Sequence, residues 1–373
     1  MTAAADPTFA IVTGGGTAGH VLPALAIADA LVAAGHARSS IHYAGSARGI
    51  EVRLVPPTGF PLTLLPGRGI QRRLTLANVA AVWGLLVAAV RAVRLVSRLR
   101  PSVVIAVGGY ASVAVGLAAV VRRVPLVIAE QNAVPGAANR LLARFAKASA
   151  VSFAGTPLPH AVVTGNPVRR EIVAIDPARD RAAARRALGV GESRRVLLVF
   201  GGSLGALRIN QAVLAALPSW RDRADLSVHH VVGARDWDAI SAAVPTDLGR
   251  LEYRAVRYED DMPRALAAAD VAVCRSGSST CFELAAVGLP SVLVPSPYVT
   301  ADQQTHNARR LVDAGGAVLV PDAELDGSRL VAEVDGLLAD PVRHAAMSEA
   351  ARAWARPDAA AAIAALAEDT ARG

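Results

Sequence analysis

Residues 13–20 have the sequence TGGGTAGH, and this stretch decides the fold. An apolar run, Phe9–Val12, precedes the glycines, and a pattern rich in Ala, Leu and Ile follows from Val21 to Ala33. A buried strand, a glycine turn and a helix in this order are typical of the start of a Rossmann-like domain. Glycines let backbone N–H groups approach an anion, and the helix N-terminus favours its charge. The stretch predicts a parallel α/β domain with an anion site, although a tight turn without a ligand is the plainer alternative.

Short runs of Val, Ile and Leu alternate with longer helical patterns along the rest of the chain. This alternation predicts parallel sheet covered by helices on both faces. The expected helices include Val21–Ala33, Ser112–Val121 and Asp302–Val312. The expected strands are Phe9–Thr13, Ile41–Tyr43, Val103–Val107, Leu126–Ala129, Val196–Phe200, Val228–Val232, Val271–Cys274 and Ser291–Val294.

The alternation stops between about Gly165 and Ser193 and restarts with VLLVFGGSLGA at residues 196–206. The second start has the same order of strand, glycine turn and helix as the first. A chain of 373 residues is also too long for one ordinary core. We therefore expect two Rossmann-like domains with a hinge near residues 165–170.

The composition narrows the class of protein. Hydrophobic residues make up 53% of the chain, which indicates a folded core, and aromatic residues only 4%, which leaves few rings for stacking on nucleic-acid bases. The net charge of +8 fits an anionic substrate or membrane surface, but also a codon bias toward Arg. The two cysteines make neither a disulfide framework nor a zinc site and fit a reducing cytoplasm. We expect no signal peptide, and no apolar run reaches the roughly 18 residues that span a bilayer.

Gly14–Gly19 matches the G-x-G-x-x-G pattern of dinucleotide-binding domains. Such a domain needs an acidic residue at the end of its second strand to hold a ribose. Here the second strand runs into Ala44–Arg48, which contains no carboxylate, and Glu51 lies too far along. His20 suits a different role, because a neutral imidazole takes a proton from a hydroxyl and the helix N-terminus disfavours its charged form. A histidine that only hydrogen-bonds local backbone is the alternative.

The second half offers three polar turns, and each follows an expected strand. Ser203 suits a phosphate oxygen, and Glu283 suits two ribose hydroxyls. Thr280 with Glu283, and Thr300 with Gln303, also have the spacing of a helix capping box, so either pair could simply close a helix. Since the carboxyl ends of parallel strands meet at one edge, the turns should line one crevice. They are GGSLGA at 201–206, RSGSSTCFE at 275–283 and TADQQ at 300–304.

Three smaller features also suggest functional roles, and two of them have a plainer interpretation. Arg169 in GNPVR could pair with a diphosphate or be a surface arginine. Asn132 in EQN could face the crevice from the first half. Asp236-Trp237-Asp238 resembles the D-x-D element of metal-dependent glycosyltransferases, but its position after a strand favours a helix start.

Residues 71–100 combine an apolar centre around Trp83 with arginines on both sides. A basic, partly amphipathic helix can rest on an anionic membrane surface. A buried helix with a solvated basic end is the alternative. The arginines are Arg72, Arg73, Arg91, Arg94, Arg98 and Arg100.

The ordered set of motifs resembles the MurG family of bacterial N-acetylglucosaminyltransferases over nearly the whole chain. The motifs are TGGGTAGH at 13–20, GGY at 108–110, EQN at 130–132, GNPVR at 165–169, GGSLGA at 201–206, CRSG at 274–277 with Glu283, and DQQ at 302–304. The resemblance implies an α/β fold of the GT-B type, in which two Rossmann-like parallel-sheet domains face a central cleft. Residues 1–168, joined by a C-terminal helix at about 356–373, would form the acceptor and membrane side. Residues 169–355 would bind UDP-GlcNAc.

The same resemblance implies a reaction. The family moves GlcNAc from UDP-GlcNAc to the C4 hydroxyl of the muramoyl sugar in lipid I, an undecaprenyl-diphosphate-linked acceptor. The anomeric configuration inverts, and the product is lipid II for peptidoglycan synthesis. The resemblance implies neither a metal nor a cofactor nor a nucleic-acid partner. It implies a peripheral position at the cytoplasmic face of the cell membrane, with the anionic inner surface as a partner.

Site roles carry over to matching positions of this chain, with His20 as the catalytic base. Two positions depart from the family pattern, because many relatives have Gln in place of Leu204 and an apolar residue in place of Glu259. The residues implied for the acceptor diphosphate are Gly14, Gly15, Gly16, Thr17, Gly108, Gly109 and Tyr110. Those implied for UDP-GlcNAc are Thr17, Gly19, Asn132, Arg169, Ser203, Glu259, Arg275, Thr280, Glu283, Gln303 and Gln304.

Three other functions stay open at this point. A GT-B enzyme could use another lipid acceptor such as diacylglycerol, an oxidoreductase would bind NAD(P) at the glycine turn, and a membrane-surface binder could keep the fold without the chemistry. The TGGGTAGH and EQN motifs disfavour the first, and the missing acidic residue disfavours the second. The presence of His20, Glu283 and the paired glutamines disfavours the third.

Overall fold

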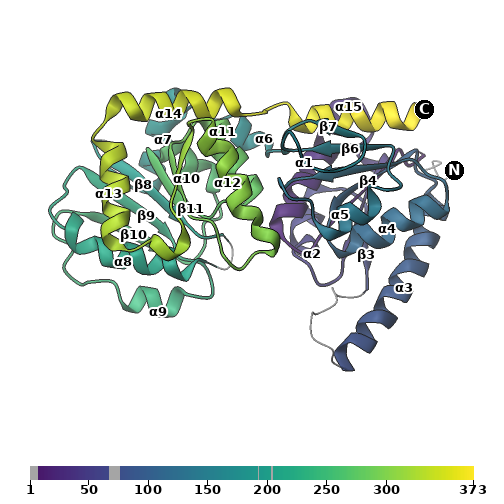
Figure 1. The fold of residues 1–373 in the computed structure, drawn as a ribbon, viewed down its shortest axis with the longest axis horizontal. Helices are drawn as coiled ribbons and strands as arrows, with labels where there is room; N and C mark the ends of the chain where they lie inside the picture. The colour runs from purple at the N-terminus through teal and green to yellow at the C-terminus, as the bar shows by residue number, and fades with distance from the viewer. Residues whose placement is uncertain (1–6, 67–75, 192, 203–204) are drawn as a thin grey trace. The chain divides into compact units, whose positions relative to one another are not determined.

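A computed structural model describes residues 7–66, 76–191, 193–202 and 205–373, and Figure 1 shows its fold. The chain divides into two compact units. One comprises Met1–Arg169 with Arg356–Gly373, and the other comprises Arg170–Ala355. Each unit has its own parallel sheet and its own core.

The first unit contains a seven-stranded sheet of order β3-β2-β1-β4-β5-β6-β7. Its neighbouring strands are parallel, with Ala10 opposite both Ile41 and Val103. This is the parallel sheet that the TGGGTAGH stretch predicts. The strands are β1 (Ala10–Gly14), β2 (Ile41–Ser46), β3 (Leu62–Leu65), β4 (Val103–Gly108), β5 (Leu126–Glu130), β6 (Ala148–Val151) and β7 (Ala161–Val163).

The helices of this unit are α1 (Ala18–Ala33), α2 (Glu51–Leu54), α3 (Leu76–Leu99), α4 (Tyr110–Val121), α5 (Ala137–Leu142) and α15 (Ala359–Arg372), with 3-10 helices η1 (Arg38–Ser40) and η2 (Pro56–Thr58). They cover both faces of the sheet. Successive strand residues point to opposite faces, so Val12 packs with α1 and Ile11 packs with α3 and α4. Full burial of one such side chain contributes about 1.5–3 kcal/mol.

The C-terminal helix α15 belongs to the first unit, where it packs against α1 and the strands β4, β5 and β6 (Figure 1). Its Ile363, Ala364 and Ala367 lie in the same core cluster as Val12. The expected helix at the end of the chain is therefore present, and it completes one face of the first sheet.

The second unit contains a six-stranded parallel sheet of order β10-β9-β8-β11-β12-β13. Its strands are β8 (Arg195–Phe200), β9 (Leu226–Val231), β10 (Glu252–Val256), β11 (Val271–Cys274), β12 (Ser291–Leu293) and β13 (Ala317–Leu319). Its helices are α6 (Arg170–Val173), α7 (Pro177–Leu188), α8 (Leu207–Trp220), α9 (Trp237–Ala242), α10 (Met262–Ala268), α11 (Ser278–Val287), α12 (Gln303–Asp313), α13 (Gly327–Leu338) and α14 (Pro341–Trp354), with 3-10 helices η3 (Thr300–Asp302) and η4 (Asp322–Glu324). Val199 and Val273 of the central strands share a core with Val213 of α8 and Val334 of α13.

All of the expected strands are present, and both sheets are parallel. The prediction of two Rossmann-like parallel-sheet domains is therefore confirmed. Among the helices of the described residues, none combines the length and the apolar character that a membrane crossing requires.

Candidate active site

Two glycine turns meet at the carboxyl edge of the first sheet. They follow the adjacent strands β1 and β4. The Gly15 N–H donates to the Gly108 carbonyl oxygen over 3.3 Å. Gly109 has a φ of +86°, and a Cβ there would lie 2.4 Å from the Gly15 oxygen, so only glycine allows this approach. Tyr110 then starts α4, and its hydroxyl donates to the Pro66 carbonyl over 3.4 Å.

The N–H groups of the first turn differ in their availability to an anion. Those of Gly15 and Gly16 donate within the protein, to the Gly108 oxygen and to the Glu51 carboxylate respectively. Among the described residues, the N–H groups of Ala18 and Gly19 have no partner. Contact of Gly14, Gly15 and Gly16 with the acceptor diphosphate stays a prediction, with the N–H groups of Gly15 and Gly16 already engaged within the protein. The first turn of α1 offers the donors.

His20 lies half-buried in this first turn of α1. Its Nδ1 lies 3.3 Å from Thr17 Oγ1, and a Cβ at Gly108 would lie 2.8 Å from its Cδ2, so the ring sits between the two turns. Burial lowers the pKa of His20 below its usual 6.5, although the charges of Glu130 and Glu51 oppose the shift. The ring is therefore neutral at pH 7 and able to accept a proton.

Glu130 ends β5 and is 2% exposed. Its carboxylate accepts hydrogen bonds from the Asn132 N–H, the Gly136 N–H and the Asn139 side-chain amide, each over 2.9 Å. The Asn132 side-chain amide also donates to it over 3.2 Å. Glu130 thus fixes the loop that carries Asn132. The EQN motif located this loop, but only the fold shows that Glu130 holds it.

The second glycine turn connects β8 to α8. Ser203 and Leu204, which the sequence analysis singled out, lie outside the described residues. A Cβ at Gly205 would lie 2.4 Å from the Val232 oxygen and 3.1 Å from Asp236 Oδ2, so the turn packs against the segment before α9. The Asn210 side-chain amide donates to Asp236 Oδ2 over 3.1 Å.

Asp236-Trp237-Asp238 starts helix α9, as the sequence analysis favoured. Asp236 pairs with Arg235 over 2.9 Å, and Asp238 pairs with Arg257 over 2.8 Å. Within the part of the chain that the structure describes, there is no group of three or more His, Cys, Asp or Glu residues that could hold a metal ion.

The buried His230 helps to hold the turn between β8 and α8 through Asn210. His230 Nε2 lies 2.9 Å from Asn210 Oδ1, and its Nδ1 lies 2.9 Å from the Tyr253 hydroxyl. Burial lowers the pKa of His230 to about 4. The imidazole is therefore neutral and fixes the Asn210 side chain that supports Asp236.

Neither Thr280 nor Thr300 stands at the N-cap of the helix that follows it. Helix α11 begins at Ser278, so Thr280 lies inside its first turn and Glu283 lies one turn further on. Helix α12 begins at Gln303, while Thr300 belongs to the preceding 3-10 helix η3. Glu283 and Gln303 are both half-buried.

The connection before α12 is strained. Ala301 and Asp302 both have left-handed backbone, with φ of 53° and 50°, which costs about 1–2 kcal/mol for each residue. Hydrogen bonds hold the residue that follows: Gln304 Oε1 accepts from the Ser296 N–H over 2.8 Å, and its backbone oxygen accepts from Ser276 Oγ over 2.9 Å. The Gln303–Gln304 pair is thus held at a fixed place.

Arg275 has a structural role in this unit. Its guanidinium pairs with Asp322 and donates to the carbonyl oxygens of Val294 and Pro295 over 3.1 Å each. These contacts tie the turn after β11 to the end of β12. The contact of Arg275 with UDP-GlcNAc stays a prediction, and its guanidinium is already paired with Asp322.

Glu259 turns its carboxylate inward. Oε2 lies 2.8 Å from Nε2 of His229, which is 2% exposed, and Oε1 accepts from the Asp261 N–H over 2.9 Å. Burial lowers the pKa of His229. Sequence reasoning did not find His229.

Arg169 is half-buried. It is the last residue of the first unit before the chain enters the second unit.

Two Rossmann-like units with polar turns at the carboxyl edges of their sheets are the architecture of the GT-B class of glycosyltransferases. The models of the glycosyltransferase family 28 N-terminal and C-terminal domains match residues 10–151 and 196–363. The chain is 44% identical to a UDP-N-acetylglucosamine–N-acetylmuramyl-(pentapeptide) pyrophosphoryl-undecaprenol N-acetylglucosamine transferase of Salinibacter ruber, over 95% of this chain and 94% of the relative. It is also 44% identical to the transferase of that name in Frankia casuarinae, over 97% and 95%.

Solved structures agree with these relatives. The crystal structure of Acinetobacter baumannii MurG is 28% identical, with a TM-score of 0.76 over 97% of this chain and all of that one. A UDP-GlcNAc 2-epimerase from Neisseria meningitidis shares the fold at 12% identity, with a TM-score of 0.69 over 97% of this chain and 99% of that one. The chain belongs to glycosyltransferase family 28 and, within it, to the MurG family.

Proposed function

We propose that this protein transfers GlcNAc from UDP-GlcNAc to the C4 hydroxyl of the muramoyl sugar in lipid I and so forms lipid II. The names of the relatives support this activity. The observation that carries the proposal is the first turn of α1, where neutral His20 lies next to the unpartnered N–H groups of Ala18 and Gly19 among the described residues. A base beside an anion site suits an acceptor that carries both a hydroxyl and a diphosphate.

His20 is the base in the proposed reaction. It accepts the proton of the C4 hydroxyl while the hydroxyl oxygen forms a bond to the anomeric carbon of GlcNAc. The bond from that carbon to UDP breaks with inversion, and its electron pair leaves with the UDP diphosphate. The charge of Glu130 favours the imidazolium that results. General base catalysis of this kind contributes roughly 10²–10⁴-fold to a rate.

The donor site of the proposal belongs to the second unit. The turns before α8 and α11 bring helix N-termini to the leaving diphosphate, with Arg169 as a further positive charge. Glu283 holds the ribose, and Gln303 with Gln304 contacts the GlcNAc. The backbone near Glu259 binds the uracil, because its carboxylate is engaged with His229.

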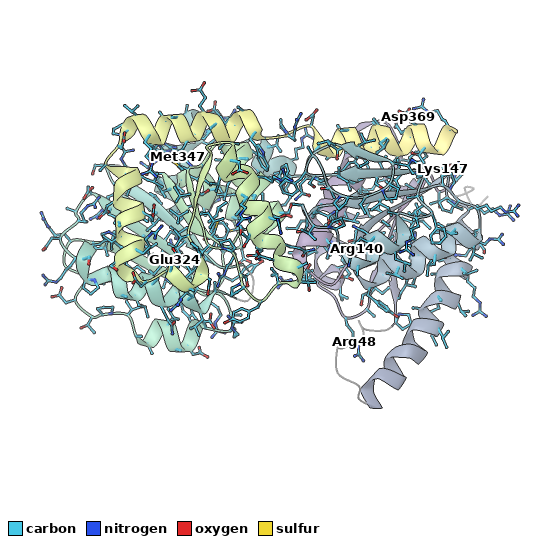
Figure 2. All side chains as sticks on the ribbon, viewed as in Figure 1. Arg48, Arg140, Lys147, Glu324, Met347 and Asp369 are labelled. Atoms are coloured by element: carbon cyan, nitrogen blue, oxygen red, sulfur yellow. The ribbon has the colours of Figure 1, made fainter. Side chains whose placement is uncertain are left out.

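The proposal also includes a surface of the first unit that faces the membrane. Phe145 is 51% exposed and Leu141 is 40% exposed, and exposed basic residues Arg140, Arg144 and Lys147 lie beside them in the sequence. Figure 2 shows Arg140 and Lys147 on this unit. Apolar side chains among positive charges bind an anionic lipid surface, and this patch supports a peripheral position at the cytoplasmic face of the membrane.

The basic helix predicted at residues 71–100 belongs to the same part of the proposal. Helix α3 covers Leu76–Leu99 and keeps Arg91, Arg94 and Arg98 exposed. Arg72 and Arg73 lie outside the described residues.

A transfer assay separates this function from its rivals. Labelled UDP-GlcNAc is offered with a short-chain lipid I analogue or with diacylglycerol, each in EDTA. A labelled disaccharide lipid from the lipid I analogue alone is the expected result. A glycolipid from diacylglycerol alone would favour another lipid acceptor, and binding of UDP-GlcNAc without transfer to either would contradict the acceptor assignment.

A further inference from the structure

A buried carboxylate lies beneath the first glycine turn. Glu51, the first residue of α2, is 0% exposed. Its Oε2 accepts from the Gly16 N–H over 3.0 Å, and its Oε1 accepts from the Ser46 N–H over 2.6 Å. Within the described part of the chain, no basic side chain pairs with it. One side chain thus connects the turn after β1 to the end of β2.

Three glycines leave room for this side chain. A Cβ at Gly15 would lie 2.2 Å from Glu51 Oε1, one at Gly45 would lie 2.7 Å from Cγ, and one at Gly49 would lie 1.9 Å from Oε2. None of these distances is possible for a real Cβ contact. The turn after β1, the strand β2 and the turn before α2 are therefore all shaped around Glu51.

The carboxylate changes what the glycine turn can bind. In dinucleotide-binding domains the N–H groups of such a turn face a pyrophosphate. Here Glu51 accepts the Gly16 N–H, so a second anion at Gly16 would meet an occupied donor and a negative charge. The N–H groups that follow, of the N-cap residue Thr17 and of Ala18 and Gly19, have no partner among the described residues. Ala18 and Gly19 lie in the same turn of helix as His20.

We propose that Glu51 is a positioning residue for the acceptor: it fixes the first glycine turn against β2 and directs the acceptor diphosphate away from Gly16 to the first turn of α1, next to His20. This inference rests on the proposed function, in which the turn serves the acceptor. It also accounts for a G-x-G-x-x-G motif that serves no dinucleotide, because the protein supplies its own anion at Gly16.

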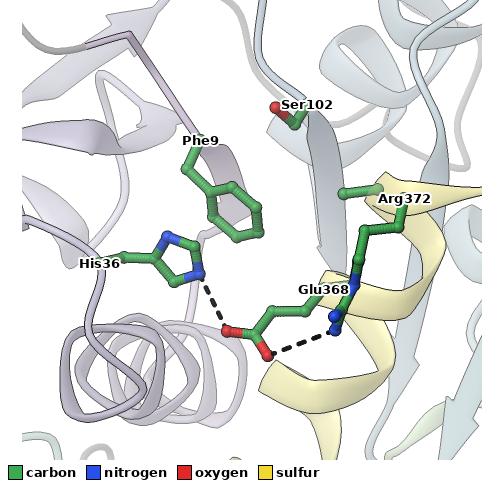
Figure 3. Close-up of a pocket in the computed structure, with 6 residues that line it drawn as sticks. Phe9, His36, Ser102, Glu368 and Arg372 are labelled. Atoms are coloured by element: carbon green, nitrogen blue, oxygen red, sulfur yellow. Dashed lines mark hydrogen bonds and ion pairs between the residues drawn. The ribbon is translucent and has the colours of Figure 1, made fainter.

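The test compares Glu51→Gln with Glu368→Gln. The first change keeps the shape of the side chain but turns an amide NH2 toward one of the two backbone donors. The second is the same chemical change in the same unit, where Glu368 Oε1 lies 2.9 Å from His36 Nε2. Glu368 lines a cavity of about 380 Å³ together with Phe9 and Ser102, which lie at the amino ends of β1 and β4 (Figure 3). The control thus lies at the edge of the sheet away from the glycine turns.

The kinetic result separates positioning from general damage. We expect Glu51→Gln to lower kcat/KM for the lipid I analogue at least tenfold, with the KM for UDP-GlcNAc within twofold of the wild type. We expect Glu368→Gln to leave both values within twofold. Equal behaviour of the two variants would overturn the inference, whereas a wild type without turnover would overturn the proposed function instead.

A second readout needs no substrate. Among the described residues, the charges acting on His20 are Glu130 from β5 and Glu51 from α2, and both raise its pKa. The NMR titration midpoint of the His20 imidazole should therefore fall in Glu51→Gln and stay unchanged in Glu368→Gln. Glu51→Asp keeps the charge on a shorter side chain and should give a midpoint nearer the wild type, and it replaces Glu51→Gln if that variant does not fold. An unchanged His20 midpoint in Glu51→Gln would overturn the inference. A midpoint in Glu51→Asp as low as that in Glu51→Gln would also overturn it.

Discussion

The space around Glu51 predicts a strong energetic coupling to Gly49. In Gly49→Ala, the new Cβ would lie 1.9 Å from Glu51 Oε2, and the backbone there is not left-handed, so the clash is the main cost. Overpacking of this kind costs about 1–3 kcal/mol. Glu51→Ala removes the clash but leaves the Gly16 and Ser46 N–H groups without their acceptor, which costs about 1–3 kcal/mol for the buried donor of Ser46.

The double variant should therefore be more stable than the sum of the two single effects predicts. Once Glu51 is an alanine, a methyl group at position 49 meets an empty space, so most of the cost of Gly49→Ala disappears. We expect a coupling free energy of about 1–3 kcal/mol between the two positions.

Urea denaturation of the wild type, both single variants and the double variant measures this coupling, provided that the m-values agree. Gly136→Ala is the matched control, since its Cβ would lie at an ordinary 3.8 Å from the Glu130 carboxylate. Its effect should add to that of Glu51→Ala. If the free-energy changes of Gly49→Ala and Glu51→Ala also add to within about 0.5 kcal/mol, the close packing of Gly49 against Glu51 is refuted.

Three further predictions follow from the site. His20→Ala should lower kcat by roughly 10²–10⁴-fold with little effect on UDP-GlcNAc binding, and an unchanged kcat would remove His20 as the base. Glu283→Ala should raise the KM for UDP-GlcNAc more than tenfold while kcat changes less, and steady-state kinetics with an unchanged donor KM would contradict its ribose contact. His230 has a folded pKa of about 4 against an unfolded value near 6.5, so its contribution to stability is complete above pH 6.5 and declines by about 3 kcal/mol as the pH falls to 4. In His230→Asn, urea denaturation across this range should show a smaller decline, and an identical decline would refute the buried neutral imidazole.

The central strands of both sheets could be predicted from the sequence because they are buried on both faces. Val103–Gly108 and Val196–Phe200 are continuous apolar runs, which the pattern identifies directly. The edge strands could not be predicted in this way. The segment Glu252–Val256 is half-exposed and contains Glu and Arg, and Ala161–Val163 is short and exposed. Their strand structure depends on pairing with a neighbour rather than on their own apolar pattern.

The motifs located the loops that hold the candidate site. The contacts within these loops could not be predicted from the sequence. Glu51 was set aside because its distance along the chain did not fit a ribose ligand, whereas the fold turns it under the glycine turn. The glycines at 45 and 49, which both precede it closely in the chain, were the signal in the sequence. Arg275 sits in a motif, yet its partner Asp322 is distant in the sequence, so the ion pair could not be foreseen.

The most direct test of the account is the stereochemistry and identity of the product made by the wild-type protein. UDP-GlcNAc and a lipid I analogue are incubated in EDTA, and the linkage of the isolated disaccharide is determined by NMR. We expect GlcNAc on the C4 oxygen of the muramoyl sugar with the anomeric configuration inverted relative to the donor. Retention of configuration, attachment at another hydroxyl, or no disaccharide from a protein that binds UDP-GlcNAc would contradict it.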